Sequence, residues 1–344
     1  MNAEFIQNLP TAEQAIARLR ELGMPRRNNE LWSFFPVAKI PTPEFMGTDF
    51  ATAPTTSPAA APANQETDFA ALLPIANQAR PMIREIVPGA AEMAMLKCNN
   101  DFGHTVLDIG KGAKVSLEIL DNKVTHDIAA ERFDINVGED ADVEIFFANP
   151  ACDLPLRFRH FYINQAAGAN VRFSSICKDT AIGRVSVECH LKGEGANFDY
   201  RSLHVLDGNA SQHSRLTIYH EAPRTTSTQL ARNLLSGSAR VSYDGSVIVG
   251  YDCTGVNSSQ LVNTILLSED ASVSVKPVLK IYHDDVECTH GNTVGELDAE
   301  QMFYLVSRGI PKKAAQEMLI RSFAQETFLP LPDSPAKKRL MSSL

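Results

Sequence analysis

No stretch of this 344-residue sequence is apolar for long enough to cross a membrane as a helix, which needs roughly 18 consecutive apolar residues. The first residues, Met1-Asn-Ala-Glu4, also lack the basic and then apolar pattern of a secretory signal peptide. The sequence therefore predicts a cytoplasmic protein with no membrane partner.

The chain also has fewer basic than acidic side chains. The chain has 32 Lys and Arg against 41 Asp and Glu, for a formal net charge of -9. Because nucleic-acid phosphates are bound by concentrated Lys and Arg, this balance argues against a nucleic-acid partner. A protein or small-molecule partner is expected instead.

Paired cysteines and the common enzyme motifs are missing as well. The six cysteines form no CxxC pair, which is typical of reduced cytosolic thiols rather than of a disulfide framework. There is no P-loop, no GxSxG nucleophile elbow and no HExxH zinc helix, so the protein is not expected to be an enzyme. The cysteines are Cys98, Cys152, Cys177, Cys189, Cys253 and Cys288.

The N-terminal segment carries a helical pattern. Thr11 and Gln14 form a capping-box pair, and Gly23 ends the pattern. The apolar positions at helical spacing are Ile16, Leu19 and Leu22. We expect an N-terminal helical region over residues 1–45, followed by a Pro/Ala/Thr-rich linker over residues 46–67.

A turn-and-strand unit recurs through the middle of the chain. Each unit has a turn rich in Gly, Asp or Ser, then an alanine, then alternating apolar residues that would share one face of a strand. Successive alanines lie 28, 28, 27, 43 and 32 residues apart, which we interpret as one period with two insertions. The alanines are Ala113, Ala141, Ala169, Ala196, Ala239 and Ala271.

Such repetition predicts stacking. One unit cannot bury its inward face alone, so a parallel β-solenoid (β-helix) over residues 68–292 is the favoured fold in a mainly β protein with small helical ends. A β-sandwich with short hairpins is the alternative, although its turns seldom repeat one small-residue signature.

The C-terminal segment, residues 293–344, switches to helical spacing. Asp298 is a good N-cap with Gln301 as its capping-box partner, and Gly309 ends this first helix before a second amphipathic helix begins. Residues 330–344 hold three prolines and a Lys-Lys-Arg cluster, and we expect this tail to be mobile.

The tripeptide Cys288-Thr-His290 carries the most chemistry. On a strand, residues i and i+2 share a face, so a thiolate and an imidazole there could bind a soft metal together. Two ligands do not make a metal site, and a core cysteine beside a hydrogen-bonded histidine is the competing interpretation. The nearby carboxylates Asp284, Asp285 and Glu287 could raise the basicity of the imidazole or form a solvated acidic loop.

Several longer segments resemble one known family. Residues 268–291 read SEDASVSVKPVLKIYHDDVECTHG, and FYLVSRGI follows at 303–310. Further agreement comes from GMPRRNNELW at 23–32, EAPRTTS at 221–227 and GSVIV at 245–249. Together these segments closely resemble the SufB/SufD family of iron–sulfur cluster assembly scaffold proteins.

The resemblance implies a right-handed parallel β-helix with a helical C-terminal domain. In this family, SufB and SufD pair through their β-helix cores, and their C-terminal helices dock the ATPase SufC. Six residues before Pro277, where SufB carries its cluster cysteine, this chain has Ala271, so it resembles the SufD branch. It is then expected to be a non-catalytic scaffold that pairs with SufB, and an isolated chain could pair with a second copy.

The resemblance also assigns residues. His290 matches the histidine that faces the SufB cysteine across the interface, and Cys288 is a weaker candidate ligand. No tightly bound cofactor is expected, only transient iron or an iron–sulfur cluster at the interface with SufB. The expected contacts with the ATPase are Met302, Phe303, Met318 and Phe323. A β-solenoid enzyme that uses a surface histidine as base, or a structural adaptor unrelated to cluster assembly, are the alternatives.

Overall fold

The structure is a computed structural model that describes residues 11–26, 28–40, 68–77, 81–98, 102–121, 128–149, 156–178 and 182–344. The predicted linker over residues 46–67 lies outside this described part of the chain. Among the described residues, no helix is both long and apolar enough to span a bilayer.

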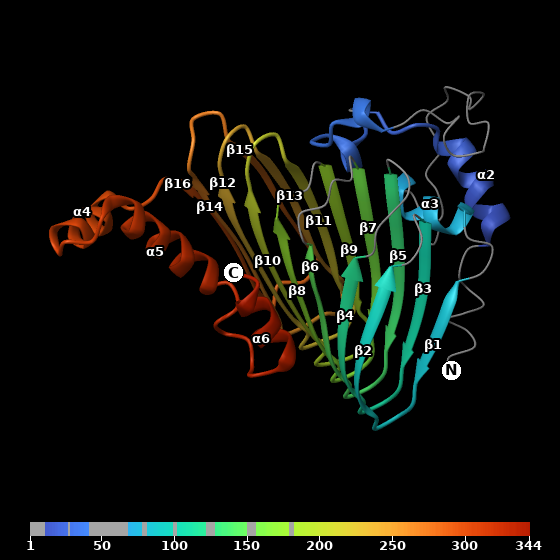
Figure 1. The fold of residues 1–344 in the computed structure, drawn as a ribbon. Coiled ribbons are helices and arrows are strands. Elements are labelled where there is room, and N and C mark those ends of the chain that lie inside the picture. The colour runs from blue at the N-terminus through green and yellow to red at the C-terminus, as the bar shows by residue number, and fades with distance from the viewer. Residues whose placement is uncertain are drawn as a thin grey trace.

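In the part of the chain that the structure describes, sixteen strands form two sheets of eight, whose arrangement Figure 1 shows. The odd sheet contains β1 (Met82–Ile86), β3 (Phe102–Ile109), β5 (Ile128–Val137), β7 (Leu156–Gln165), β9 (Ile182–Leu191), β11 (Ser211–His220), β13 (Arg240–Val249) and β15 (Ser272–Ile281). The even sheet contains β2 (Ala91–Cys98), β4 (Lys114–Asp121), β6 (Asp142–Asn149), β8 (Asn170–Lys178), β10 (Asn197–Leu206), β12 (Thr226–Leu235), β14 (Val256–Leu266) and β16 (Val286–Gly295).

Each strand pairs in parallel with the strand two places along the chain, so one coil contributes one strand to each sheet. Parallel neighbours joined through the opposite sheet make a β-solenoid, because a sandwich of hairpins would pair adjacent strands antiparallel. The predicted parallel β-solenoid is confirmed, and its right-handed sense stays a prediction. Its first described strand begins at Met82 and its last ends at Gly295.

The alanine repeat is real, but the larger of the two predicted insertions, the 43-residue gap, is wrong. The 32-residue gap is a single coil, from Arg240 to Ser272, which is three residues longer than the coil from Ser211 to Arg240. Ala196 ends a turn from the odd to the even sheet, and the register of Asn197 with Thr226 shows that Thr225 takes its place one coil later. Ala239 ends a turn at the opposite edge, where Ala210 precedes it by one coil. The 43-residue gap is therefore a change of edge, which sequence spacing alone could not reveal.

Close stacking of the turns explains why small residues recur there. A Cβ at Gly193 would overlap the backbone of Ala167 in the preceding coil. The corner alanines Ala169 and Ala196 have no exposed surface. Successive coils approach so closely at these corners that larger side chains would have to displace backbone.

The interior of the early coils is largely apolar. The rings of Phe133 and Phe161 stack with centroids 4.8 Å apart, and Phe173 meets Phe161 edge-on at 4.8 Å. These coils also enclose an ion pair in which Arg159 Nε donates to Glu131 Oε2 at 2.6 Å. Burial of the aromatic column supplies much of the driving force for stacking.

The N-terminal helices cover the outer face of the odd sheet. Helix α2 (Ala12–Leu22) has the predicted capping box and ends at Gly23, and two short 3-10 turns follow, η1 (Glu30–Trp32) and η2 (Val37–Lys39). Helix α3 (Phe69–Asn77) packs against α2, β3, β5 and β7, although the solenoid was expected to begin by residue 68.

A buried ion pair holds this covering layer in place. Arg184 Nη2 lies 2.7 Å from Asp68 Oδ2, and the guanidinium lies 4.2 Å from the ring centroid of Trp32. Burial alone would raise the pKa of Asp68, but the charge and hydrogen bond of Arg184 together with nearby His160 and Arg215 outweigh it, so that pKa is lowered. The N-terminal region is thus joined to the solenoid through β9.

Three C-terminal helices follow β16. Helix α4 (Ala299–Ser307) starts at Asp298, whose side chain accepts from the backbone N–H groups of Glu300 and Gln301. Helices α4 and α5 (Lys312–Gln325) extend away from the sheets, whereas α6 (Pro335–Ser342) returns to lie beside them (Figure 1).

The expectation of a mobile tail is wrong. Leu340 of α6 is fully buried in a cluster with Phe146 and Leu203, which lie on the outer face of the even sheet. Arg339 donates two hydrogen bonds to Glu118, each of 2.8 Å. The prolines start and precede a helix instead of preventing one, and apolar packing on the sheet holds it.

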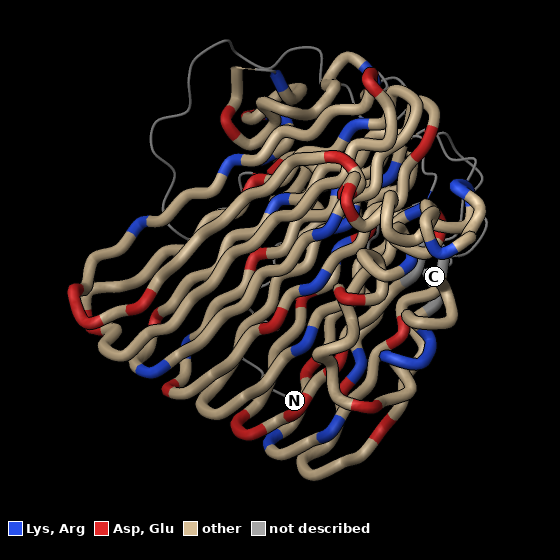
Figure 2. The backbone as a smooth tube through the Cα atoms, turned by 90° about the vertical axis from the view of Figure 1, so that its left-hand side faces the viewer, with Lys and Arg blue, Asp and Glu red and all other residues tan. Residues whose placement is uncertain are grey.

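Charges of both signs alternate along the strands and turns on the face that Figure 2 presents.

We expect Leu340→Ala to release α6 without unfolding the solenoid. Truncating the side chain of a fully buried leucine costs about 2–5 kcal/mol. We expect this cost to exceed the free energy that holds a short helix on the sheet. Amide hydrogen exchange in residues 327–344 should accelerate at least tenfold, on the order expected for local opening. The exposed Lys338→Ala is the matched control, and unchanged exchange in Leu340→Ala would contradict the docking.

Candidate functional site

The last coil of the solenoid is the site on which the sequence prediction centres. Strand β16 pairs with β14 on one side, and among the described strands it is the last of its sheet. Its other edge therefore offers unpaired backbone groups, a template for another strand. His290 lies in the middle of this edge strand, directly beside Gln260 of β14.

Both predicted ligands point toward the solenoid interior. Cys288 packs against the inward cluster that contains Val249 and Cys253. Side chains alternate along a strand, so His290 shares the inward face with Cys288, as the i, i+2 spacing predicted. His290 is exposed because no further described coil covers it, and its ring makes no hydrogen bond to the described residues.

A ladder of hydrogen bonds lies beneath Cys288. His220 bonds through Nδ1 with Thr225 Oγ1 (2.8 Å) and through Nε2 with Ser227 Oγ (3.0 Å). Ser227 Oγ lies 2.8 Å from Ser258 Oγ, and Ser258 is in register with Cys288. The ladder therefore leads, coil by coil, to the candidate thiol.

A second ladder lies beneath His290. Tyr243 Oη donates to Gln229 Oε1 at 3.0 Å, and Gln260 Nε2 donates to the same oxygen at 3.2 Å. Gln260 is in register with His290. In earlier coils the same column holds Phe173 and Tyr200, so the interior becomes polar toward this end.

A third ladder ends differently. Asn233 lies 2.8 Å from His204 Nδ1 and donates to Thr264 Oγ1 at 2.9 Å. The next position in this column is Val294 of β16, which has no polar side chain. Two of the three polar columns thus end on a side chain able to bind a metal.

The chemistry available at the last coil is limited. Burial raises the pKa of the Cys288 thiol, so the thiol stays protonated at neutral pH in the uncovered chain. No cluster of three or more His, Cys, Asp or Glu side chains suited to a metal occurs among the described residues. Cys288 and His290 are thus at most two ligands, which fit a borderline metal such as iron in type but not in number.

The three carboxylates near this pair are not directed at His290. Asp285 accepts a hydrogen bond from Thr254, and Asn257 donates to Glu287 at 3.1 Å. Asp284 is fully exposed in the turn before β16. Asp284 and Asp285 thus form a solvated acidic turn and Glu287 is exposed at the start of β16, which favours the second interpretation of these carboxylates.

The expected ATPase contacts divide into two groups. Phe303 is 75% exposed and Met318 is 50% exposed, whereas Met302 is half-buried. Phe323 packs beneath Arg232, whose guanidinium lies 4.7 Å from its ring centroid. Phe323 therefore helps to anchor α5 on the solenoid.

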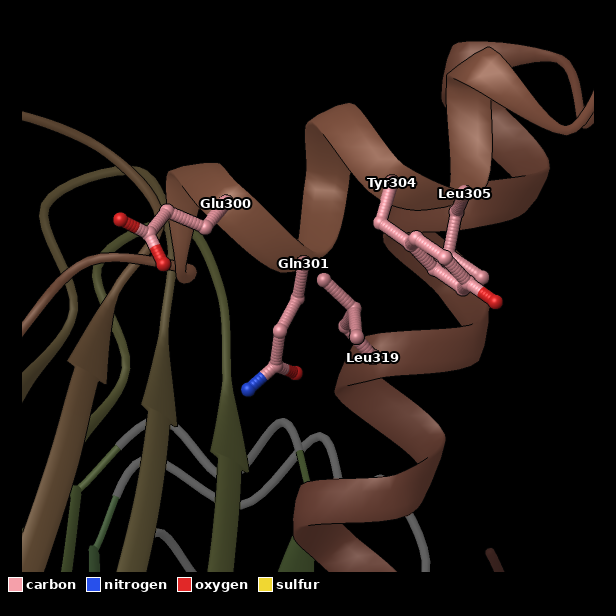
Figure 3. Close-up of a pocket in the computed structure, with 5 residues that line it drawn as sticks. All are labelled: Glu300, Gln301, Tyr304, Leu305 and Leu319. Carbon is pink, nitrogen blue, oxygen red and sulfur yellow. The ribbon is translucent and has the colours of Figure 1, made fainter.

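A pocket lies between α4 and α5 (Figure 3). Its lining is mostly apolar, and Gln301 and Leu319 approach each other from the two helices. The lining residues are Glu300, Gln301, Tyr304, Leu305 and Leu319.

One polar cluster was missed in the sequence. On the outer face of the odd sheet, His190 Nδ1 lies 2.6 Å from Glu221 Oε1 and its Nε2 lies 3.0 Å from Glu188 Oε1. Burial would lower the pKa of His190, but the two carboxylates outweigh it and raise that pKa. The cluster joins β9 to the turn after β11, and only the coil register brings its members together. The neighbouring Cys189 is buried on the opposite, inward face of β9.

The fold and the site thus define a class of protein, a two-sheeted parallel β-solenoid whose last coil carries a thiol and an imidazole on one face. Residues 93–323 match the family described as "SUF system FeS cluster assembly, SufBD core domain". This match covers more than half of the chain. The chain belongs to the SufBD family of iron–sulfur cluster assembly proteins, as the resemblance predicted.

Its relatives include proteins named SufD. The chain is 32% identical over 244 residues to iron–sulfur cluster assembly protein SufD of Escherichia coli, which covers 69% of this chain and 57% of that protein. It is 29% identical over 188 residues to SufD of Bacillus subtilis (53% and 43% covered) and 30% identical over 175 residues to chloroplastic ABCI7 of Arabidopsis thaliana (50% and 36% covered). The chain thus spans about half the length, or less, of these relatives.

We expect the stability of the protein to fall in mild acid through His220. Burial lowers the pKa of this imidazole from 6.5 to about 4, so the folded state keeps it neutral while the unfolded state takes up a proton below about pH 6.5. The stabilisation is complete above that pH and is lost between about pH 6.5 and 4. Between about pH 7.5 and 5 the loss amounts to about 2 kcal/mol.

Urea unfolding at several pH values checks this expectation. His220→Gln retains hydrogen-bonding groups but does not titrate, so its free energy of unfolding should fall less steeply across the same range. Parallel pH profiles for the variant and the original chain would show that His220 is not the group responsible.

Proposed function

We propose that this chain is a SufD-like, non-catalytic scaffold subunit that works in the cytoplasm with SufB-like and SufC-like partners to assemble iron–sulfur clusters. The observation that carries the proposal is His290, held on the inward face of the uncovered edge strand of a SufBD-family core. The protein named SufD in Escherichia coli is a cluster assembly protein, and it shares 32% identity with this chain.

The last coil is suited to pairing with another chain. It leaves an unpaired strand edge together with apolar side chains that a further coil would have covered. Val294 is 49% exposed and Ile281 is 39% exposed, and both occupy inward positions of the last coil. A SufB-like solenoid that added its own strands here would bury these side chains and bring its residues to His290.

Pairing would also complete the metal site. His290 offers an imidazole nitrogen and Cys288 a thiol, and iron in clusters needs further thiolate ligands. A partner cysteine at the joint would supply them, so the reactivity belongs to the assembly. Iron and the growing cluster are the cargo of this site.

The ATPase contact is assigned to α4 and α5. Phe303, Tyr304 and Met318 are all at least half exposed, and the two helices extend beyond the sheets (Figure 1). A two-helix unit of this length cannot bury so much apolar surface by itself. The pocket between the helices would accept an apolar side chain of the partner.

We expect His290→Ala to reduce cluster assembly by at least about tenfold in the complex with SufB-like and SufC-like chains, the scale on which loss of a metal ligand or its support acts. Assembly is followed by the visible absorbance of the cluster, and complex formation by co-purification. Thr289→Ala, one position along on the opposite face of the same strand, should have no effect. Full activity of His290→Ala in an intact complex would favour the plain adaptor.

We expect Phe303→Asp to weaken binding of the ATPase subunit while SufB pairing persists. A charge in the middle of an apolar contact typically costs about 2–4 kcal/mol, or at least about 30-fold in affinity. Met93→Asp is the matched control, since Met93 is 54% exposed at the other end of the solenoid. Equal loss in both variants, or none in Phe303→Asp, would remove α4 from the contact.

A further inference from the structure

Gln260 has a buried acceptor that nothing in the described structure satisfies. The residue is only 3% exposed, and its Oε1 atom has no hydrogen-bond partner. A buried unpaired acceptor typically costs about 1–3 kcal/mol, so the position of this oxygen needs a reason.

The Gln260 carboxamide is held firmly in place. Its Nε2 atom donates to Gln229 Oε1, which also accepts from the hydroxyl of Tyr243. Gly245 on the facing sheet leaves the room that the carboxamide fills, because a Cβ there would overlap Gln260 Nε2. With Nε2 committed to the coil below, Oε1 is the atom left for the coil above.

Two inward positions lie over this carboxamide in the last coil. On the odd sheet, Pro277 is in register with Gly245 and has no N–H group to donate. On the even sheet, His290 is in register with Gln260. Neighbouring strands are about 4.8 Å apart, which places an inward imidazole N–H within hydrogen-bonding reach of a side-chain oxygen one strand below. His290 is the directly stacked side chain that has a donor.

We propose that Gln260 is a positioning residue for His290: the two are not bonded in the ring orientation of this structure, and a rotation of the exposed imidazole lets one ring N–H of His290 donate a hydrogen bond to the unpaired Gln260 Oε1. The bond fixes the imidazole tautomer and leaves the other ring nitrogen, with its lone pair, directed to the open end of the solenoid. A neutral imidazole held in this way is ready to bind iron. The metal class rests on the proposed function, whereas the hydrogen bond itself does not.

The third polar column provides a built-in comparison. Thr264 occupies the same coil as Gln260 and takes part in a similar ladder, but the residue above it is Val294. If interior polarity affected the last coil in a general way, removing the polar side chain of either Gln260 or Thr264 would change the His290 ring. A specific effect on His290 should appear only when Gln260 loses its oxygen.

The test is the tautomer ratio of His290 in the full chain, measured by nitrogen-15 NMR with labelled histidine at a pH where the ring is neutral. His290→Gln identifies the signal. In the unmodified chain one tautomer should predominate beyond the ratio of a free imidazole by about fivefold, the effect of one net hydrogen bond. This excess should vanish in Gln260→Leu, stay in Gln260→Glu, which keeps an acceptor, and stay in Thr264→Val.

Two results would overturn the inference. One is an unmodified chain in which His290 has the tautomer ratio of free imidazole, a measurement that needs no variant to fold. The other is a folded Gln260→Leu with an unchanged ratio. Neither result depends on cluster assembly, so the positioning role of Gln260 and the scaffold function can be refuted separately. Absence of a tautomer preference would refute the positioning role, and an active His290→Ala complex would refute the scaffold function proposed for His290.

Discussion

The in-register parallel pairing of successive coils is the constraint on which the rest of this structure depends. Each strand satisfies its backbone groups with the strands one coil before and after it, so a residue in one coil is stacked on its counterpart in the next. Side chains on the inward face therefore form columns that run the length of the solenoid. What a column contains in one coil limits what the next coil places above it.

The columns explain why the interior changes character along the chain. Early coils stack phenylalanines, and their large apolar area drives the coils together. Later coils replace them with Gln, Ser, Asn and His, each paired with its counterpart in an adjacent coil. Because a buried polar group is costly unless it is bonded, a polar column has to continue until it reaches the end or solvent. The columns beneath Cys288 and His290 do so at the last coil.

The two helical ends leave that coil uncovered. The N-terminal helices cover the outer face of the odd sheet, and α6 covers part of the outer face of the even sheet. Within the described ranges, neither covers the unpaired edge of the last strands, although Glu30 reaches Lys276 of β15 at 2.6 Å. The last coil therefore presents the unpaired edges of β15 and β16 for pairing, and His290 lies in the edge of β16.

The amino-acid sequence by itself determined the local features. Alternating apolar residues give each strand one inward face, and the Thr11 and Asp298 caps fix two helix starts. The small alanines at the corners allow successive coils to stack closely. The i, i+2 spacing also placed Cys288 and His290 on one face. Each of these depends on neighbours within a few residues, where chain geometry is fixed by bond rotation and side-chain periodicity.

Only the tertiary structure decided how coils align, because alignment is a contact between residues about thirty positions apart. The 43-residue spacing looked like an insertion and proved to be a change of edge, which the register of Asn197 with Thr226 resolves. The tail looked mobile until the outer face of the even sheet supplied a surface for Leu340. For the same reason the sequence did not single out Gln260. Its unpaired oxygen becomes notable only once the register shows that His290 stacks above it.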